Sequence, residues 1–172
     1  MAKPAKLIVV SDSHGNRDGL RAVLDAHRDA DALIFLGDGL NDLTAVQRSG
    51  PCPMVYEVRG NCDYDKTIPS ERLVSLGGLL IFMTHGNGYE VKVTTTPLRK
   101  AAAQRGADIV LFGHTHSPYY AYIDGVNLFN PGSISVPRVG RPTYGLLLIE
   151  DGELTDYSRK GRMLTVDLKL KD

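Results

Sequence analysis

The sequence lacks the features that mark secreted and membrane proteins. Its two cysteines, Cys52 and Cys62, form no CxxC pair and are too few for a disulfide framework, so a reducing cytoplasm is the expected location. The longest apolar runs, such as residues 79–83, are far shorter than a membrane span. The apolar run near the N-terminus, residues 7–10, is too short for the core of a signal peptide.

Net charge is also absent, because twenty Lys and Arg residues balance twenty Asp and Glu residues. No positive field therefore favours a nucleic acid or an anionic membrane surface as partner. The chain shows no internal repeat, linker or low-complexity run, and 172 residues with 42% hydrophobic content are ample for one buried core. We expect a single domain over residues 1–172. A homo-oligomer is compatible with the sequence, but no heptad or apolar surface stripe identifies an interface.

Short apolar runs alternate with helical patterns in the first two thirds of the chain. Strands are predicted at 6–12, 31–38, 54–61, 72–86 (a hairpin turning at Gly77-Gly78) and 108–114, and helices at 16–30, 40–50 and 94–106. Asn16 and Thr96 are the predicted N-caps of the first and third helices. Strands follow at 119–124, 126–130, 144–159 (a hairpin at Asp151-Gly152) and 163–171. The pattern indicates an α/β domain with a β-rich second half.

Five predicted strands end at residue types that bind metal ions. These residues are Asp12, His14, Asp38, Asn61, His85, His114 and His116. They lie in the stretches "SDSHG", "LGDG", "RGNCD", "THGNG" and "FGHTH", where glycine lets the backbone turn sharply. In open α/β sheets, ligand sites lie beyond the carboxyl ends of the strands. We therefore expect the seven side chains to converge on one site.

Each of these residues, taken alone, also has an ordinary structural explanation. Asp12 and His14 would fit a helix-capping turn, and Asp38 would fit a turn at the end of a strand. The recurrence of the pattern at the same position in the topology favours a common ligand site instead. The fifth histidine of the chain, His27, lies inside the first predicted helix and is expected to be structural.

The donor atoms narrow the choice of metal. Two aspartates, one asparagine and four histidines provide oxygen and nitrogen without thiolate, which suits Mn, Fe, Co, Ni or Zn better than Ca or Mg. Seven ligands exceed what one ion with an open position needs, so two ions that share a carboxylate fit better. Two such ions, about 3.5–4 Å apart, hold a bridging hydroxide for in-line attack on phosphorus.

The stretches "SDSHGN", "LGDGLND", "RGNCD", "THGNGY" and "GHTH" resemble, in order and spacing, the motif series of the calcineurin-like metallophosphoesterases. With "NPGSISVPR" added, the chain is similar to their small YfcE-type phosphodiesterase branch over roughly residues 6–150. The resemblance implies an α/β (α+β) fold, a four-layer αββα sandwich of two mixed β-sheets flanked by helices. It also implies a dinuclear site at the strand ends and a small phosphoester as substrate.

The resemblance assigns the ligands to two ions. One ion would be held by Asp12, His14, Asp38 and His116, and the other by Asp38 as the bridge with Asn61, His85 and His114. Asn61 and His85 are also expected to act in catalysis. Mn²⁺ is the ion expected, with Ni²⁺, Fe²⁺, Co²⁺ and Zn²⁺ as alternatives.

Two positions depart from many relatives. Cys62 stands, on the expected leaving-group side, where those relatives carry a histidine that is thought to protonate the leaving group. A thiol with a pKa of about 8.5 is a poor substitute, which predicts better activity on esters with good leaving groups, and on diesters, than on alkyl monoesters. Asn87 replaces another histidine. Asp63 is predicted either to orient a group on the substrate side or only to shape its turn.

The leading functional prediction is a dinuclear metal-dependent phosphodiesterase. A phosphomonoesterase, or a hydrolase of nucleotides or dinucleoside polyphosphates, would use the same site. A non-catalytic protein-binding scaffold on the same fold is the third reading, and the complete set of ligand-type residues argues against it.

Overall fold

The computed structural model describes residues 4–155 and 164–165 of the chain. In chain order the elements are β1 (Ala5–Val10), α1 (Arg17–Ala26), β2 (Ala32–Phe35), α2 (Leu40–Ser49), β3 (Met54–Glu57), β4 (Glu71–Leu76), β5 (Leu79–Thr84), the 3₁₀ helix η1 (Asn87–Tyr89), α3 (Thr96–Gln104), β6 (Ile109–Leu111), β7 (Pro118–Ile123), β8 (Val126–Pro131), β9 (Thr143–Glu150), β10 (Glu153–Thr155) and β11 (Leu164–Thr165). Apart from β11, the strand predicted at 163–171 lies outside the described residues.

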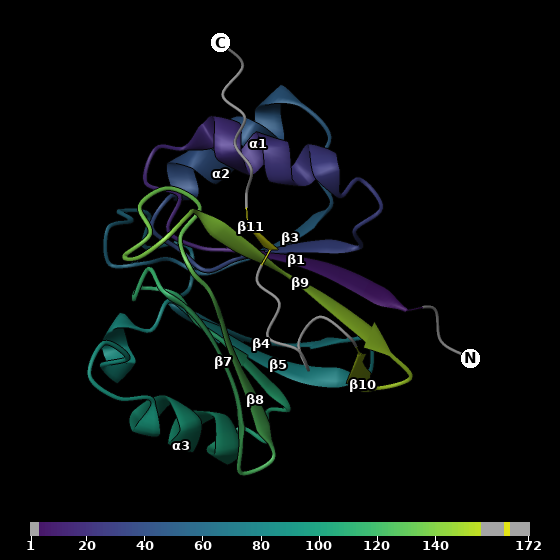
Figure 1. Cartoon of the computed structure of the whole chain (residues 1–172), viewed down its shortest axis with the longest axis vertical. Coiled ribbons are helices and arrows are strands. Elements are labelled where there is room, and N and C mark those ends of the chain that lie inside the picture. Colours follow the sequence, from purple (N-terminus) through teal and green to yellow (C-terminus); the bar gives the residue numbers. More distant parts are fainter. Residues whose placement is uncertain (1–3, 156–163, 166–172) are drawn as a thin grey trace.

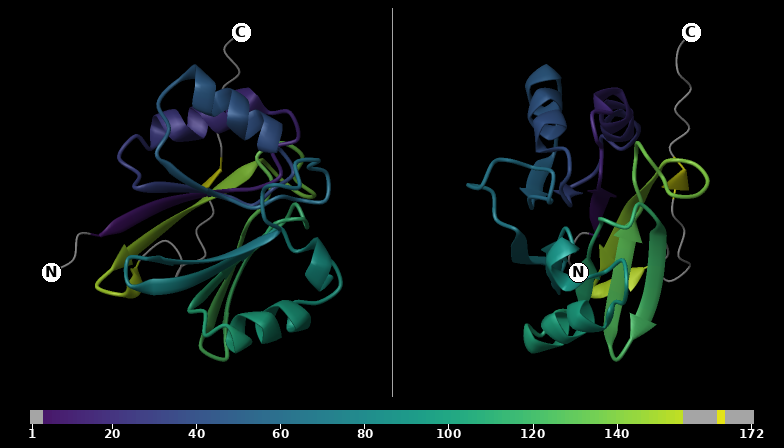
Figure 2. Two further views of the ribbon diagram at one scale, coloured as in Figure 1. Left: turned by 180° about the vertical axis from the view of Figure 1, so that it is seen from behind. Right: turned by 90° about the vertical axis from the view of Figure 1, so that its left-hand side faces the viewer.

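Two mixed sheets lie face to face between helices (Figures 1 and 2). The first has the order β10-β9-β1-β2-β3, with β11 also paired to β9, and the second has the order β4-β5-β6-β8-β7. The neighbours β1, β2 and β3 are parallel, as are β5, β6 and β8. Helices α1 and α2 cover the outer face of the first sheet and α3 that of the second. The predicted four-layer αββα sandwich is confirmed.

Strand β1 shows why the sequence forms these layers. Successive side chains of a strand point to opposite faces. Leu7 and Val9 pack in the core between the sheets, while Ile8 and Val10 pack against α1 and α2. All four are fully buried, as expected for a strand covered on both faces, so the run shows no alternation of polar and apolar residues. A third apolar cluster lies between α3 and the second sheet.

The helix starts were predicted to within one residue. The Asn16 side chain accepts a hydrogen bond from the N–H of Gly19 at 2.9 Å, so it is the N-cap of α1 as predicted. The N-cap of α3 is Thr95 rather than Thr96, because the N–H of Arg99 bonds to the carbonyl of Thr95 at 2.9 Å and closes the first turn there. No described helix is long and apolar enough to cross a membrane.

Candidate metal centre

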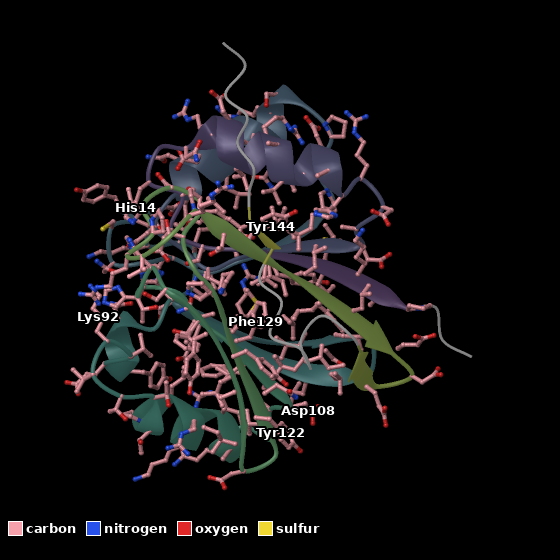
Figure 3. The ribbon with its side chains drawn as sticks, viewed as in Figure 1. His14, Lys92, Asp108, Tyr122, Phe129 and Tyr144 are labelled. Atoms are coloured by element: carbon pink, nitrogen blue, oxygen red, sulfur yellow. The ribbon has the colours of Figure 1, made fainter. Side chains whose placement is uncertain are left out.

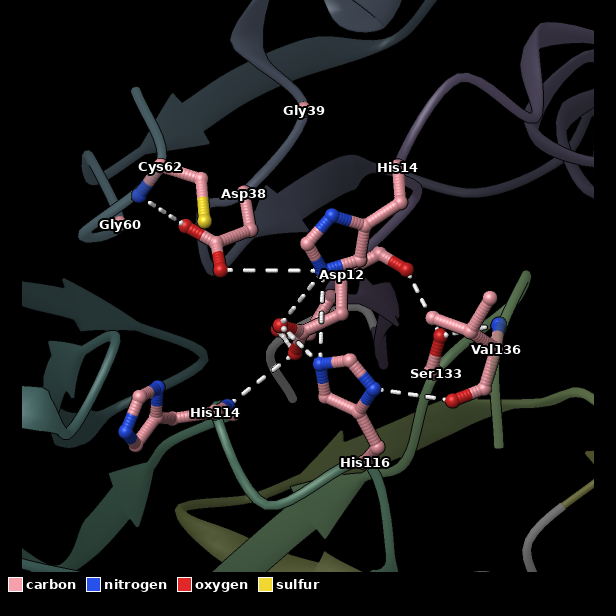
Figure 4. A network of polar contacts seen from close by, with 12 residues as sticks. Asp12, His14, Asp38, Gly39, Gly60, Cys62, His114, His116, Ser133 and Val136 are labelled. Carbon is pink, nitrogen blue, oxygen red and sulfur yellow. Dashed lines mark hydrogen bonds and ion pairs between the residues drawn. The ribbon is translucent and has the colours of Figure 1, made fainter. Parts of the chain in front are cut away.

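The loops after five strands bring the predicted ligand-type residues to one edge of the sandwich (Figure 4). From the first sheet, Asp12 and His14 follow β1, Asp38 follows β2, and Asn61 follows β3; from the second sheet, His85 follows β5, and His114 and His116 follow β6. The parallel strands of each sheet end on the same side, and the two sheets are stacked so that these ends meet. The site is therefore assembled from both sheets.

A first group of side chains consists of Asp12, His14 and His116, whose ligand atoms all lie within 4.8 Å of one another. The Nε2 atom of His116 is 3.1 Å from Oδ1 of Asp12 and 3.3 Å from Nε2 of His14. The Nε2 atom of His14 is 3.6 Å from the same carboxylate oxygen. Three potential ligand atoms thus face a common point.

A second group consists of Asp38, His85 and His114. The Nε2 atom of His85 is 3.2 Å from Oδ2 of Asp38 and 3.3 Å from Nδ1 of His114. The Oδ2 atom of Asp38 is also 3.7 Å from Nε2 of His14, which belongs to the first group. Asp38 therefore lies between the two groups, where a carboxylate shared by two ions would have to lie.

Asn61 and Cys62 lie in the loop after β3. Nδ2 of Asn61 is 3.5 Å from Sγ of Cys62. The Cys62 thiol forms a third potential ligand group with His14 and Asp38. Burial, followed by the charge of Asp38, raises the pKa of this thiol, so at neutral pH it is protonated. Asn87 lies in η1 and is exposed.

The backbone at the site is strained. Asp12, His14, Asp38, His114 and His116 all have φ between 38° and 68°, in the left-handed region. This conformation costs a non-glycine residue about 1–3 kcal/mol, and it persists only where the surrounding structure enforces it. Such strain clusters at functional sites, so its concentration on the predicted ligands is independent support for a site here.

Hydrogen bonds fix the ring orientation of two histidines. Nδ1 of His85 is 2.7 Å from the carbonyl oxygen of Leu36, and Nδ1 of His116 is 2.8 Å from that of Val136. A carbonyl oxygen only accepts, so in both rings Nδ1 carries the proton. Nε2 is then the nitrogen that faces the carboxylates, and a second ring nitrogen held by a carbonyl is typical of histidines that bind metals.

The electrostatics of the site favour a cation. Burial alone would raise the pKa of Asp38, but the hydrogen bond and charge of His85, with the backbone N–H of Cys62, lower it well below its usual range. Burial would lower the pKa of His85, but the carboxylates of Asp38 and Asp12 raise it. The pKa of His114 is lowered by burial and by the charges of His85 and Lys92.

One buried oxygen tests whether a metal ion fits this site. Oδ2 of Asp12 accepts hydrogen bonds from Ser11 Oγ at 2.5 Å and from the N–H of His114 at 3.1 Å. Oδ1 of Asp12 is among the few buried side-chain atoms of the described residues that have no hydrogen-bond partner. An unpaired buried carboxylate oxygen is costly, and this one faces the histidine nitrogens. The oxygen and nitrogen donors therefore fit a divalent transition metal.

Asp63 supports the site without facing it. Its Oδ2 accepts the N–H groups of Asp38 at 2.7 Å and Gly60 at 2.8 Å, and its Oδ1 accepts those of Gly39 and Leu40, both at 3.0 Å. Both oxygens are thus engaged with backbone. These four bonds leave neither oxygen of Asp63 to orient a group on the substrate side.

Other supporting contacts were not identified from the sequence. Oδ2 of Asp42 accepts hydrogen bonds from Ser13 Oγ at 2.6 Å and from the N–H of Gly15 at 2.8 Å, which fixes the loop that carries His14. Ser133 Oγ donates to the carbonyl oxygen of Asp12 at 2.7 Å (Figure 4). Asn130 Nδ2 donates to the carbonyl oxygen of Gly113 at 3.0 Å. The stretch "NPGS" is a turn by composition, and only its likeness to the family placed it near the site.

The fifth histidine lies away from these groups. His27 caps the C-terminus of α1, and its Nε2 is 2.7 Å from the hydroxyl of Tyr144 in β9. A hollow of about 550 Å³ is also remote from the site, since it is lined by residues that begin β5 and precede β6, such as Leu79 and Asp108. Neither feature adds ligands to the centre.

Comparisons with known proteins agree with this geometry. The calcineurin-like phosphoesterase superfamily domain matches residues 6–152. The chain is 32% identical over 152 residues to a probable metallophosphoesterase, YsnB of Bacillus subtilis, covering 87% of each chain. It is 30% identical over 167 residues to the phosphodiesterase YfcE of Escherichia coli, covering 83% of this chain and 86% of that one. A crystal structure of a predicted phosphoesterase from Streptococcus pneumoniae TIGR4 matches with TM-score 0.81 and 28% identity, covering 97% and 92%.

Proposed function

The chain belongs to the calcineurin-like phosphoesterase superfamily, in its small YfcE/YsnB-type branch, and on this basis we propose that it is a dinuclear metal-dependent phosphodiesterase. The observation that carries the proposal is the position of Asp38. Its Oδ2 lies 3.7 Å from Nε2 of His14 and 3.2 Å from Nε2 of His85, so one carboxylate oxygen faces ligand atoms of both groups.

We further propose that residues 1–172 form a single domain that works in the cytoplasm. Two free cysteines support that location.

The proposed ligands divide between two ions. Asp12, His14, Asp38 and His116 would hold one, and Asp38, Asn61, His85 and His114 the other, with Mn²⁺ as the expected metal. When bound, such ions supply Lewis-acid activation of a water nucleophile and neutralise charge on the phosphate oxygens. Asp38 contributes a carboxylate that stays ionised at neutral pH, because the pKa of its side chain is strongly lowered. Asn61 and His85 are the residues we expect beside the reacting phosphate.

The chain's own contribution is mainly orientation. The carbonyls of Leu36 and Val136 hold the imidazoles of His85 and His116 with Nε2 toward the carboxylates. Asp63 holds the backbone of Asp38, which sets the position of the shared carboxylate. Holding reacting groups in a fixed geometry removes an entropic barrier before the reaction begins.

The Cys62 side of the site supports a preference for diesters. The thiol lies with His14 and Asp38, and its raised pKa makes it a weaker acid than an ordinary cysteine. It therefore gives little help to a leaving group that needs a proton. Leaving groups that depart as stable anions, such as aryloxides, need no such help.

Hydrolysis assays on metal-stripped protein test the proposal. With Mn²⁺ added back, we expect bis(4-nitrophenyl) phosphate to be cleaved faster than 4-nitrophenyl phosphate, which has the same leaving group. No hydrolysis of the diester with Mn²⁺, Ni²⁺, Co²⁺, Fe²⁺ or Zn²⁺ would contradict the proposed activity. Faster cleavage of the monoester would favour a phosphomonoesterase.

A further inference from the structure

Two cationic residues lie beside His114 and His116 of the metal centre. Lys92 and Arg138 line a hollow of about 180 Å³ together with His114, Thr115 and His116. Figure 3 places Lys92 on the same side of the molecule as His14. A pocket for a whole small molecule typically has about 300–1,000 Å³. The hollow is therefore of a size for one group of a substrate.

The backbone at both residues is held in place. The N–H of Arg138 donates to the carbonyl oxygen of His116 at 3.0 Å, and the carbonyl oxygen of Val136 accepts from Nδ1 of His116. On the other side of the hollow, Val91 is only 6% exposed and packs in the cluster under α3, which fixes the position of Lys92. The two charged side chains themselves are exposed.

Neither charge is neutralised by an ion pair within residues 4–155. Arg17, Arg72 and Arg105 each form an ion pair with a carboxylate. Within residues 4–155, no such pair involves Lys92 or Arg138. The whole chain has a formal net charge of zero, so the two cations are a local excess beside the site.

The Cys62 side of the centre is different in character. Cys62 lies with His14 and Asp38 rather than with the two histidines that line the hollow, and both oxygens of the nearby Asp63 are occupied by backbone N–H groups. A substrate that places its phosphate at the metal ligands thus has a thiol on the side of Cys62 and two cations on the side of Lys92 and Arg138. This asymmetry gives the two substituents of a diester different environments.

We propose that Lys92 and Arg138 bind a second anionic group of the substrate, so that the enzyme prefers phosphodiesters that carry a further phosphate. The inference rests on the proposed phosphodiesterase function. The leaving group would lie on the Cys62 side and the phosphorylated substituent on the side of the two cations. Guanidinium and ammonium groups form charge-assisted hydrogen bonds with phosphate, and guanidinium does so with two parallel bonds.

A matched pair of esters tests this inference. Thymidine 5′-(4-nitrophenyl phosphate) and the same ester with a 3′-phosphate have the same leaving group and differ by one anionic group. With Mn²⁺ at low salt, we expect the KM of the wild-type protein to be about tenfold lower for the 3′-phosphorylated ester. The quantity compared is the KM of the ester without the 3′-phosphate divided by the KM of the ester with it. We expect Lys92→Gln and Arg138→Gln each to reduce this KM ratio to about 3, and the double variant to reduce it to about 1.

The control variant is Lys100→Gln, which removes an exposed lysine of α3 that lines a different hollow. It should keep the wild-type ratio, and 0.5 M salt should reduce that ratio in the wild-type protein, because exposed charges are screened. If both esters are cleaved with equal KM, or if the KM ratio persists in the double variant, the inference is overturned while the phosphodiesterase proposal stands. No cleavage of either ester would overturn the phosphodiesterase proposal and this inference with it.

Discussion

The carboxylate of Asp63 holds the backbone of Asp38, with Oδ2 of Asp63 accepting the Asp38 N–H at 2.7 Å. The same oxygen accepts the N–H of Gly60 at 2.8 Å, so one atom joins the loops after β2 and β3. The loops approach so closely that a Cβ atom at Gly60 would lie 2.1 Å from Oδ1 of Asp38. The position of the proposed shared ligand is thus set by a carboxylate that does not face the metal site.

We expect Asp63→Asn to weaken Mn²⁺ binding about 10- to 100-fold, the usual cost of losing a group that orients a metal ligand. The side-chain amide in Asp63→Asn has one accepting oxygen, and its NH₂ group would face backbone N–H groups that have no acceptor. We therefore also expect the free energy of unfolding to fall by about 1–3 kcal/mol. Calorimetric titration with Mn²⁺ and thermal unfolding measure both effects. Asp65→Asn is the matched control, because Asp65 is exposed and bonds only to Thr67. Unchanged Mn²⁺ affinity in Asp63→Asn would contradict the positioning role.

The two groups around Asp38 predict two metal ions per chain. Each group supplies enough donors for one ion. After dialysis against excess Mn²⁺, we therefore expect elemental analysis to give about two equivalents of manganese per chain. His85→Ala should reduce the content toward one equivalent, because His85 belongs to the second group only. Saturation of the wild-type protein at one equivalent, without a weaker second site, would refute the dinuclear arrangement.

Replacing the shared carboxylate should abolish most activity. We expect Asp38→Asn to lower kcat for bis(4-nitrophenyl) phosphate by at least about 10²-fold, because metal activation of the nucleophile supplies much of the rate enhancement. His27→Ala is the comparison, since His27 contacts Tyr144 and lies outside both groups. It should keep kcat within a few-fold of the wild type. Equal activities of the two variants would refute the assignment of Asp38.

Cys62→His tests whether the site lacks a general acid. General acid catalysis is typically worth about 10²–10⁴-fold, so histidine should recover part of this for poor leaving groups and little for good ones. The measurement is the dependence of kcat/KM on leaving-group pKa for aryl and alkyl diesters, with metal content checked. A flatter dependence in the variant supports the idea. A uniform loss, or parallel dependences, would show that Cys62 is present for its size.

His27 predicts a pH-dependent contribution to stability. Burial, followed by the charge of Lys6, lowers the pKa of His27 in the folded state. The unfolded chain then binds the proton more tightly, so stability rises with pH up to about 6.5, the ordinary histidine pKa, and is constant above it. The free energy of unfolding is measured by urea titration for the metal-free wild type and for His27→Gln. We expect the difference, wild type minus variant, to increase between pH 5 and pH 7. A constant or falling difference would contradict the prediction.

The sequence was sufficient to predict which residues meet, but not what holds them. Parallel strands end at the same edge of a sheet, so Asp12, Asp38 and His85 could be assigned to one site from their positions after apolar runs. The roles of Asp42 and Asp63 could not be predicted, because most of their partners are N–H and O–H groups 23 to 29 positions away in the chain. Which loop offers those groups depends on packing that no local pattern encodes.

The same limit applies to Lys92 and Arg138. Arg138 ends the stretch "NPGSISVPR", but no local pattern placed either cation beside the metal ligands. Their positions depend on the burial of Val91 and on the hydrogen bond between Arg138 and His116. Thr96 is a smaller example, because the hydrogen bond from the N–H of Arg99 to the carbonyl of Thr95 makes Thr95 the N-cap of α3.

The division of the ligands between two sheets determines when the site exists during folding. His14 and His116 are 102 positions apart, yet their Nε2 atoms lie 3.3 Å from each other. Contacts this distant in the chain form late, after the entropy of closing long loops has been overcome. A partly folded chain that contains only one sheet therefore offers half of the donors. Metal would then bind the native state almost exclusively, and bound ions would slow unfolding by tying the two sheets together at their edge.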